Sequence, residues 1–210
     1  MKAFAWRFPL CLALVGWALA RCGPWVVEAL LPAIAAEIQW LDNTYRIVSL
    51  EVLPRAGEQV VQIVVTLARC VVLPDGAHCG DPRGRAQVST LLGHVTLPMA
   101  LTVSMVLAWP ASRWLEVVWR GTQLWPALAI LLSLDVPMVL WGSLWRLHVD
   151  AFAPGLWSPL LLWMDFLQGG GRIALAIVTA GLVVAAGRWL SGRPAGAQPA
   201  ESRQRGAAPP

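Results

Sequence analysis

Apolar residues gather into long runs that alternate with short polar segments along most of this chain. The run Val88–Trp109 contains no Asp, Glu, Lys or Arg. At about 1.5 Å of helical rise per residue it is long enough to cross a hydrocarbon core of ~30 Å. Shorter or more interrupted runs occupy residues 4–22, 124–144 and 173–190. The pattern predicts a mainly α-helical, polytopic membrane protein with about four transmembrane helices.

The first apolar run could be either a signal peptide or a membrane anchor. Residues 1–22 begin with basic residues, continue with an apolar core and end with small residues, as a cleaved signal peptide does. However, apolar residues resume in residues 25–41, directly after Gly23-Pro24. We therefore expect an uncleaved membrane helix that breaks at this dipeptide, because proline interrupts helical hydrogen bonds. A second helix, kinked at Pro32, would then lie at the outer interface.

Between the first two membrane helices the hydrophobic period changes to that of a β-strand. In residues 58–73, β-branched residues alternate with polar ones, which places the apolar side chains on one face. Tyr45–Leu53 has the same character, and a turn of four residues, Pro54–Gly57, separates the two segments. A third strand, Arg85–Leu91, would lead directly into the second membrane helix. The sequence thus predicts a small β-rich extracytoplasmic domain.

Two cysteines in this domain are candidates for a disulfide. Cys70 and Cys79 flank a segment that contains the turn residues Pro74, Asp75 and Gly76. A disulfide is expected if the domain lies in an oxidising compartment, and two free thiols are the alternative.

The remaining chain is predicted to be membrane again. A helix over residues 124–144 would be followed by a loop that contains a short interfacial helix, and then by the helix 173–190. The predicted units are residues 1–41 (first membrane helix and interfacial helix), 42–87 (β domain), 88–190 (three-helix membrane domain) and 191–210 (disordered cytoplasmic tail).

Composition and charge support a membrane protein and give its expected orientation. The chain is 57% apolar and only 13% charged, where about 25% charged is usual for soluble domains. Its net charge of +4 comes from dispersed basic residues, so we expect no nucleic-acid partner. With both termini in the cytoplasm most arginines flank the helices on the cytoplasmic side, as the positive-inside rule requires. Membrane lipid is the expected surrounding partner.

One ionisable residue lies inside a predicted membrane helix. Asp135 is near the middle of the third helix, where a carboxylate is costly and indicates a functional site. It could belong to a proton or cation path. Alternatively, it is protonated or accepts hydrogen bonds from Thr102 or Ser104 on the second helix, and thereby holds the helices together.

A second group of polar residues is expected at the outer face. His94, His148, Asp150 and Arg172 all fall at the outer ends of predicted helices or in the outer loop. The chain has no nucleophile motif, phosphate-binding loop or zinc-ligand spacing. We therefore expect no metal, no cofactor and no catalytic residues, and lean towards a protein that is not an enzyme.

The layout resembles a known family of small membrane proteins. The segment GRAQVSTLLGHVTLPMALTVSMVLAW joins a short strand to a membrane helix through Gly93–Leu101. In this stretch and in the order of its elements, the chain is similar to the exosortase H-associated proteins of Gram-negative bacteria. The resemblance implies an inner-membrane location and an accessory role beside an exosortase-like transpeptidase that processes C-terminal sorting tails. It supplies no catalytic residues. A transporter or channel component using Asp135 is the alternative.

Overall fold

The computed structural model describes residues 2–55, 57–73, 76–79 and 84–191. In chain order its elements are α1 (Lys2–Leu41), β1 (Tyr45–Arg55), β2 (Glu58–Leu67), β3 (Val71–Leu73), β4 (Gly76–His78), β5 (Arg85–Leu91), α2 (Leu92–Ala108), α3 (Trp114–Phe152), α4 (Pro159–Phe166), the one-turn segment η1 (Leu167–Gly171) and α5 (Arg172–Ser191). The predicted disordered tail lies, apart from Ser191, outside the described residues.

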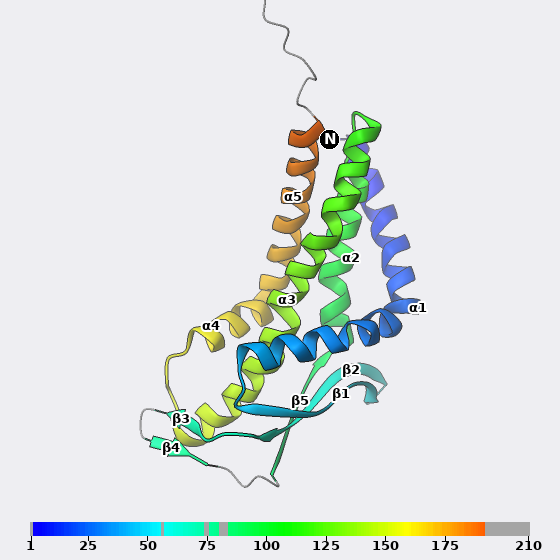
Figure 1. Ribbon diagram of the computed structural model, residues 1–210. Coiled ribbons are helices and arrows are strands. Elements are labelled where there is room, and N and C mark those ends of the chain that lie inside the picture. Colours follow the sequence, from blue (N-terminus) through cyan, green and yellow to red (C-terminus); the bar gives the residue numbers. More distant parts are fainter. Residues whose placement is uncertain (1, 56, 74–75, 80–83, 192–210) are drawn as a thin grey trace, which may run out of the picture.

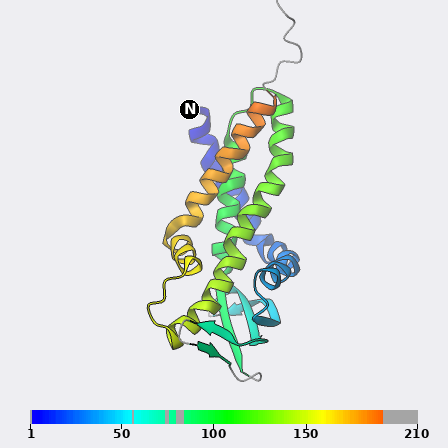
Figure 2. The ribbon, with the colours of Figure 1, turned by 60° about the vertical axis from the view of Figure 1, so that its left-hand side comes forward.

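Helices form an upright bundle with a small sheet at one end, which we call the sheet end (Figures 1 and 2). Three helical segments of the described chain are long and apolar enough to cross a membrane: Phe4–Leu41, Trp114–Phe152 and Pro159–Ser191. α2 is also apolar but has only 17 residues. It packs between α1, α3 and α5. These apolar helices make the chain a membrane-embedded protein, as its hydrophobic pattern predicts.

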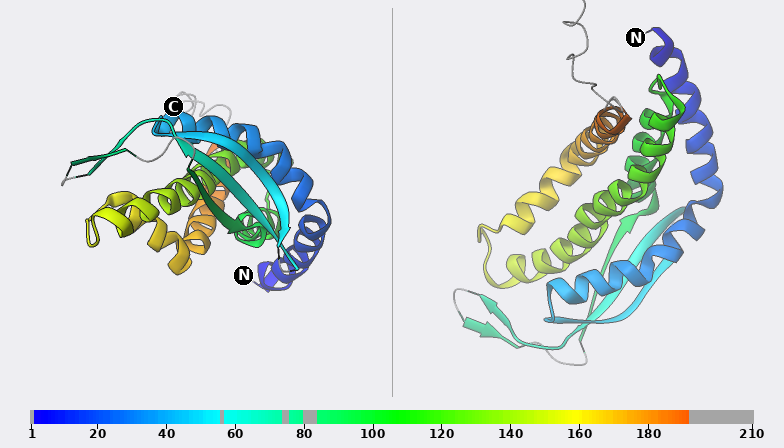
Figure 3. Two further views of the ribbon diagram at one scale, coloured as in Figure 1. Left: turned by 90° about the horizontal axis from the view of Figure 1, so that it is seen from below. Right: turned by 45° about the horizontal axis from the view of Figure 1, so that its top comes forward.

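α1 is one bent helix where the sequence predicted two helices separated by a break. Its first half stands upright in the bundle and its second half runs across the sheet end (Figures 1 and 3). Pro24 lies inside the helix, and its missing N–H group accounts for the bend. Gly23 permits the close approach to α2 there, because a Cβ atom would lie 3.3 Å from the methyl group of Thr96.

The three-stranded antiparallel sheet has the strand order β1-β2-β5. Its register places Val61 of β2 opposite Val52 of β1 and Thr90 of β5, and β1 is irregular between Ile47 and Ser49. The sheet lies as a layer below the second half of α1 (Figure 1). Alternate residues of a strand point to the same side of the sheet. Because the apolar residues of these strands occupy alternate positions, one face of the sheet is apolar. It is buried against α1, α2 and α3 in a core that includes Val27, Ile38, Val61, Ile63, Leu140 and Leu144.

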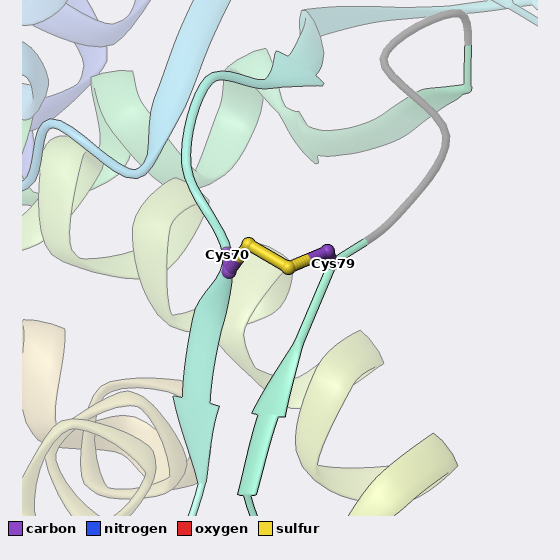
Figure 4. The surroundings of a disulfide bond; sticks show 2 residues. All are labelled: Cys70 and Cys79. Atoms are coloured by element: carbon purple, nitrogen blue, oxygen red, sulfur yellow. A yellow bond between two sulfur atoms is a disulfide. The ribbon is translucent and has the colours of Figure 1, made fainter.

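The predicted long second strand is two elements in the structure. β2 ends at Leu67, and a separate two-stranded hairpin, β3-β4, follows. A disulfide joins Cys70, just before β3, to Cys79, just after β4 (Figure 4). The bond therefore closes the hairpin at its base.

α3 is much longer than the predicted helix 124–144. With 39 residues it also includes most of the segment before that range and the start of the loop after it. After α4, the chain turns at Gly170, whose φ of 106° lies in the left-handed region that favours glycine. α5 then begins at Arg172, close to the start of the predicted fourth helix.

Candidate functional site

Asp135 of α3 forms an ion pair with Arg172, the first residue of α5. The Nε–H group of Arg172 donates a hydrogen bond of 2.7 Å to Oδ1 of Asp135. The exposed fraction is 2% for Asp135 and 8% for Arg172, so both charged groups are buried. The pair links the middle of α3 to the start of α5.

The expected partners of Asp135 on α2 are engaged elsewhere. Thr102 donates to the carbonyl oxygen of Pro98 at 2.8 Å and also lies 3.3 Å from that of Ala176. Ser104 is buried, and within the described residues its hydroxyl has no hydrogen-bond partner. The interpretation that Thr102 or Ser104 holds Asp135 is therefore wrong, because Arg172 fills that role.

A cavity of about 460 Å³ opens at the sheet end beside this ion pair. We call it the sheet-end cavity. Its walls come from β5, α2, α3, η1 and the start of α5. Its polar lining includes His94, Ser143, Gln168 and Arg172, and the rest is largely apolar. Of the predicted outer-face group, this cavity brings His94 and Arg172 together.

The other two members of that group lie elsewhere. His148 is buried, and its Nδ1 lies 3.1 Å from the hydroxyl of Tyr45 and 3.0 Å from the carbonyl oxygen of Leu144. Asp150 is exposed and lines a different cavity, which also contains the ion pair of Arg146 and Asp165. The expected single cluster is thus divided among three places.

Polar contacts that the sequence did not reveal fix the sheet to the bundle. Besides the Tyr45–His148 contact, the indole Nε1–H of Trp141 donates to Asp42 at 2.9 Å. The other carboxylate oxygen of Asp42 accepts from the backbone N–H of Thr44 at 2.7 Å. The start of β1 is therefore tied to α3 at two points. The sequence marked only one of these residues as unusual, because Tyr45 is the only tyrosine of the chain.

The phenol of Tyr45 is expected to resist ionisation. Burial, and to a lesser extent the charge of Asp42, raise its pKa well above the usual value near 10. A raised folded-state pKa means that the neutral phenol contributes stability that is complete below pH ~10 and is lost as pH rises further. Because Tyr45 is the only tyrosine, the pH-dependent change in absorbance at the phenolate band reports it alone. The folded protein should show no phenolate band at pH ~10, and the denatured protein should show it. Identical titrations would contradict the buried contact.

A second buried ionic cluster lies at the opposite end of the bundle. Glu116, near the start of α3, forms an ion pair with Arg120, and its second oxygen accepts from the N–H of Ser112 at 2.8 Å. Arg120 also donates to the carbonyl oxygen of Trp109 at 2.7 Å. Arg188 of α5 lies 3.5 Å from Glu116. The Glu116 cluster therefore joins the α2–α3 connection to the end of α5.

His94 and His148, the two histidines whose side chains the structure describes, have no hydrogen bond to a serine, threonine or cysteine side chain within the described residues. Nucleophilic catalysis needs an imidazole within hydrogen-bond reach of a hydroxyl or thiol nucleophile. His148 contacts a tyrosine and a backbone oxygen instead. Among the described residues, no group of three or more His, Cys, Asp or Glu side chains is placed to hold a metal ion. What the site offers is an ion pair beside a cavity of mixed polarity.

Comparisons of the chain with models of protein families, with curated proteins and with solved structures found no match.

Proposed function

We propose that this chain is a non-enzymatic accessory subunit of an exosortase-type complex in a bacterial inner membrane, and that its sheet contacts the partner. The observation that carries the proposal is a small sheet held on a membrane bundle by side-chain hydrogen bonds and a shared apolar core. Its apolar face is fully used in the core, so the other face is the one left for a partner. The family resemblance of the sequence supplies the kind of complex.

The free face of the sheet has the character of a surface for a non-obligate partner. The register aligns Glu51, Gln62 and Ser89 in one row across the three strands, and Arg46 lies on the same side. Glu51 and Arg46 are exposed. Neighbouring side chains on this face already interact, because Gln87 donates to Gln62 at 2.8 Å. Val64 lies beside Gln62 on this face, and a surface of mixed polar and apolar side chains suits subunits that associate without being obligate partners.

The sheet is also placed firmly enough to present that face. The Tyr45–His148 and Asp42–Trp141 contacts join β1 to α3, and β5 leads into α2 without a connecting residue. A contact surface that is already ordered loses less conformational entropy on binding than a mobile one. This arrangement therefore supports a docking role.

We do not propose the transporter alternative. It rested on Asp135 as an ionisable residue inside a predicted membrane helix. Its ion pair with Arg172 accounts for the buried charge without a permeant ion. Loss of solute or ion flux in Asp135→Asn, with membrane insertion unchanged, would revive it.

The proposal is tested by isolating the tagged full-length chain from its native membrane in mild detergent. We expect a membrane-embedded transpeptidase of exosortase type to co-purify in a fixed stoichiometry. The double variant Arg46→Glu/Glu51→Arg keeps the net charge but reverses the charges on the free face, so it should reduce the amount of partner.

The matched control reverses another pair of charges at the sheet end. Arg146→Asp/Asp165→Arg exchanges the members of the ion pair between α3 and α4, neither of which belongs to a strand, and should leave the partner in place. Recovery of a homo-oligomer alone would overturn the proposal, and so would equal losses of partner in both double variants.

A further inference from the structure

We propose that the sheet-end cavity binds a glycerophospholipid, with Arg172 holding the phosphate of its headgroup. This inference does not depend on the accessory role. It starts from the two-sided character of the cavity. The buried guanidinium of Arg172 forms one part of its lining, and the half-exposed apolar side chains of Leu97 and Ile173 form another. A phospholipid has the same division between headgroup and chains.

Arg172 is prepared to bind a second anion. Asp135 accepts the hydrogen bond from its Nε–H group, which fixes the plane of the guanidinium. Within the described part of the chain no other side chain is hydrogen-bonded to its Nη groups, and Arg172 lines the cavity. A guanidinium can bind two oxygens of one phosphate side by side, which makes arginine a common phosphate ligand.

Other donors lie around the same space. The imidazole of His94 and the amide of Gln168 line the cavity, and each can donate an N–H group to a phosphate oxygen. Asp135 offsets the charge of Arg172, so the site binds a phosphate group through oriented hydrogen bonds more than through net charge. This favours a phosphodiester within a headgroup that also carries a positive charge, because the buried site then stays close to neutral.

The position of the cavity suits a lipid in the bilayer. It lies where the apolar helices α2 and α5 begin, the level at which headgroups meet the hydrocarbon core. Leu97 of α2 and Ile173 of α5 line it and are 48% and 45% exposed. Ile177, one turn further along α5, is 47% exposed. Acyl chains can therefore leave the cavity along an exposed apolar strip.

The test is native mass spectrometry of the full-length protein in detergent, titrated with dioleoylphosphatidylethanolamine. We expect a discrete adduct of one lipid. Asp135→Asn/Arg172→Gln removes the guanidinium without leaving a buried charge, and should weaken the adduct about tenfold, the usual effect of losing charge-assisted hydrogen bonds. Its matched control, Asp165→Asn/Arg146→Gln, removes the other Arg–Asp pair at this end and should bind as the parent does.

A second variant probes the cavity without touching the ion pair. Leu97→Trp places a bulky indole ring at the exposed wall of the cavity and should block binding of the lipid. Leu182→Trp, at a 65% exposed position of α5 outside the cavity lining, should not. Dioleoylglycerol, which lacks the phosphate, and inorganic phosphate, which lacks the chains, should both give no adduct. Equal binding of either compound overturns the proposal, as does parental lipid binding by both cavity variants. A bound peptide in place of a lipid would also overturn it.

Discussion

Replacing Arg172 by glutamine is expected to lower the free energy of unfolding by about 3–5 kcal/mol, because it leaves the buried carboxylate of Asp135 without its counter-charge. The cost comes from desolvation of the remaining charge more than from the loss of one contact. Reversible unfolding in mixed micelles, followed by tryptophan fluorescence, measures the change. The chain has thirteen tryptophans, so the signal is strong.

Removing the partner as well should reverse most of this loss. In Asp135→Asn/Arg172→Gln two neutral amides replace the ion pair, so no unpaired charge stays buried, and replacing a whole buried pair by uncharged side chains is often close to neutral in stability. The double variant is therefore expected to lie nearer to the parent than either single variant does. If Arg172→Gln alone were as stable as the parent, the two residues could not be a buried pair.

The second large effect is expected at the other end of the bundle. Glu116→Leu should cost about 3–5 kcal/mol, because it leaves the 4% exposed guanidinium of Arg120 without its carboxylate. It also removes the acceptor for the N–H of Ser112. The same unfolding assay measures the loss. Limited proteolysis should in addition show faster cleavage after Arg113, in the connection that the cluster holds.

An exposed ion pair supplies the control for this prediction. The side chains of Arg146 and Asp165 are 36% and 55% exposed, so their attraction is screened by water. Asp165→Leu should therefore cost only about 0–1 kcal/mol. A similar loss in Asp165→Leu and Glu116→Leu would show that burial is not the cause.

Local patterns in the sequence were enough to locate most elements. The alternation of β-branched residues identified the strand around Ile63 and its neighbours, and the apolar run over residues 173–190 identified α5. Both signals depend on residues close together in the chain. The pairing of Cys70 with Cys79 was also accessible, because the turn residues between them bring the two cysteines together.

The ionic contacts were harder to predict because they join distant segments. Asp135 and Arg172 are 37 residues apart. Because Arg172 follows a run of three glycines, the sequence predicted it at the edge of the outer loop and not beside the middle of α3. The Glu116–Arg120 pair did have a local signal, the spacing of four residues on a helix. It was missed because the predicted helix began only at residue 124, whereas α3 begins at Trp114.

The direct junction between β5 and α2 limits how this chain can change in evolution. β5 ends at Leu91 and α2 begins at Leu92, so no loop separates strand from helix. One inserted residue would move the strand side chains to the opposite face of the sheet, or turn the helix by about 100° relative to it. Thr90 on the sheet and Val95 on the helix are both buried, so neither shift leaves the core intact. Relatives of this protein should therefore align without gaps across this junction, and length differences should collect in the hairpin that Cys70 and Cys79 close.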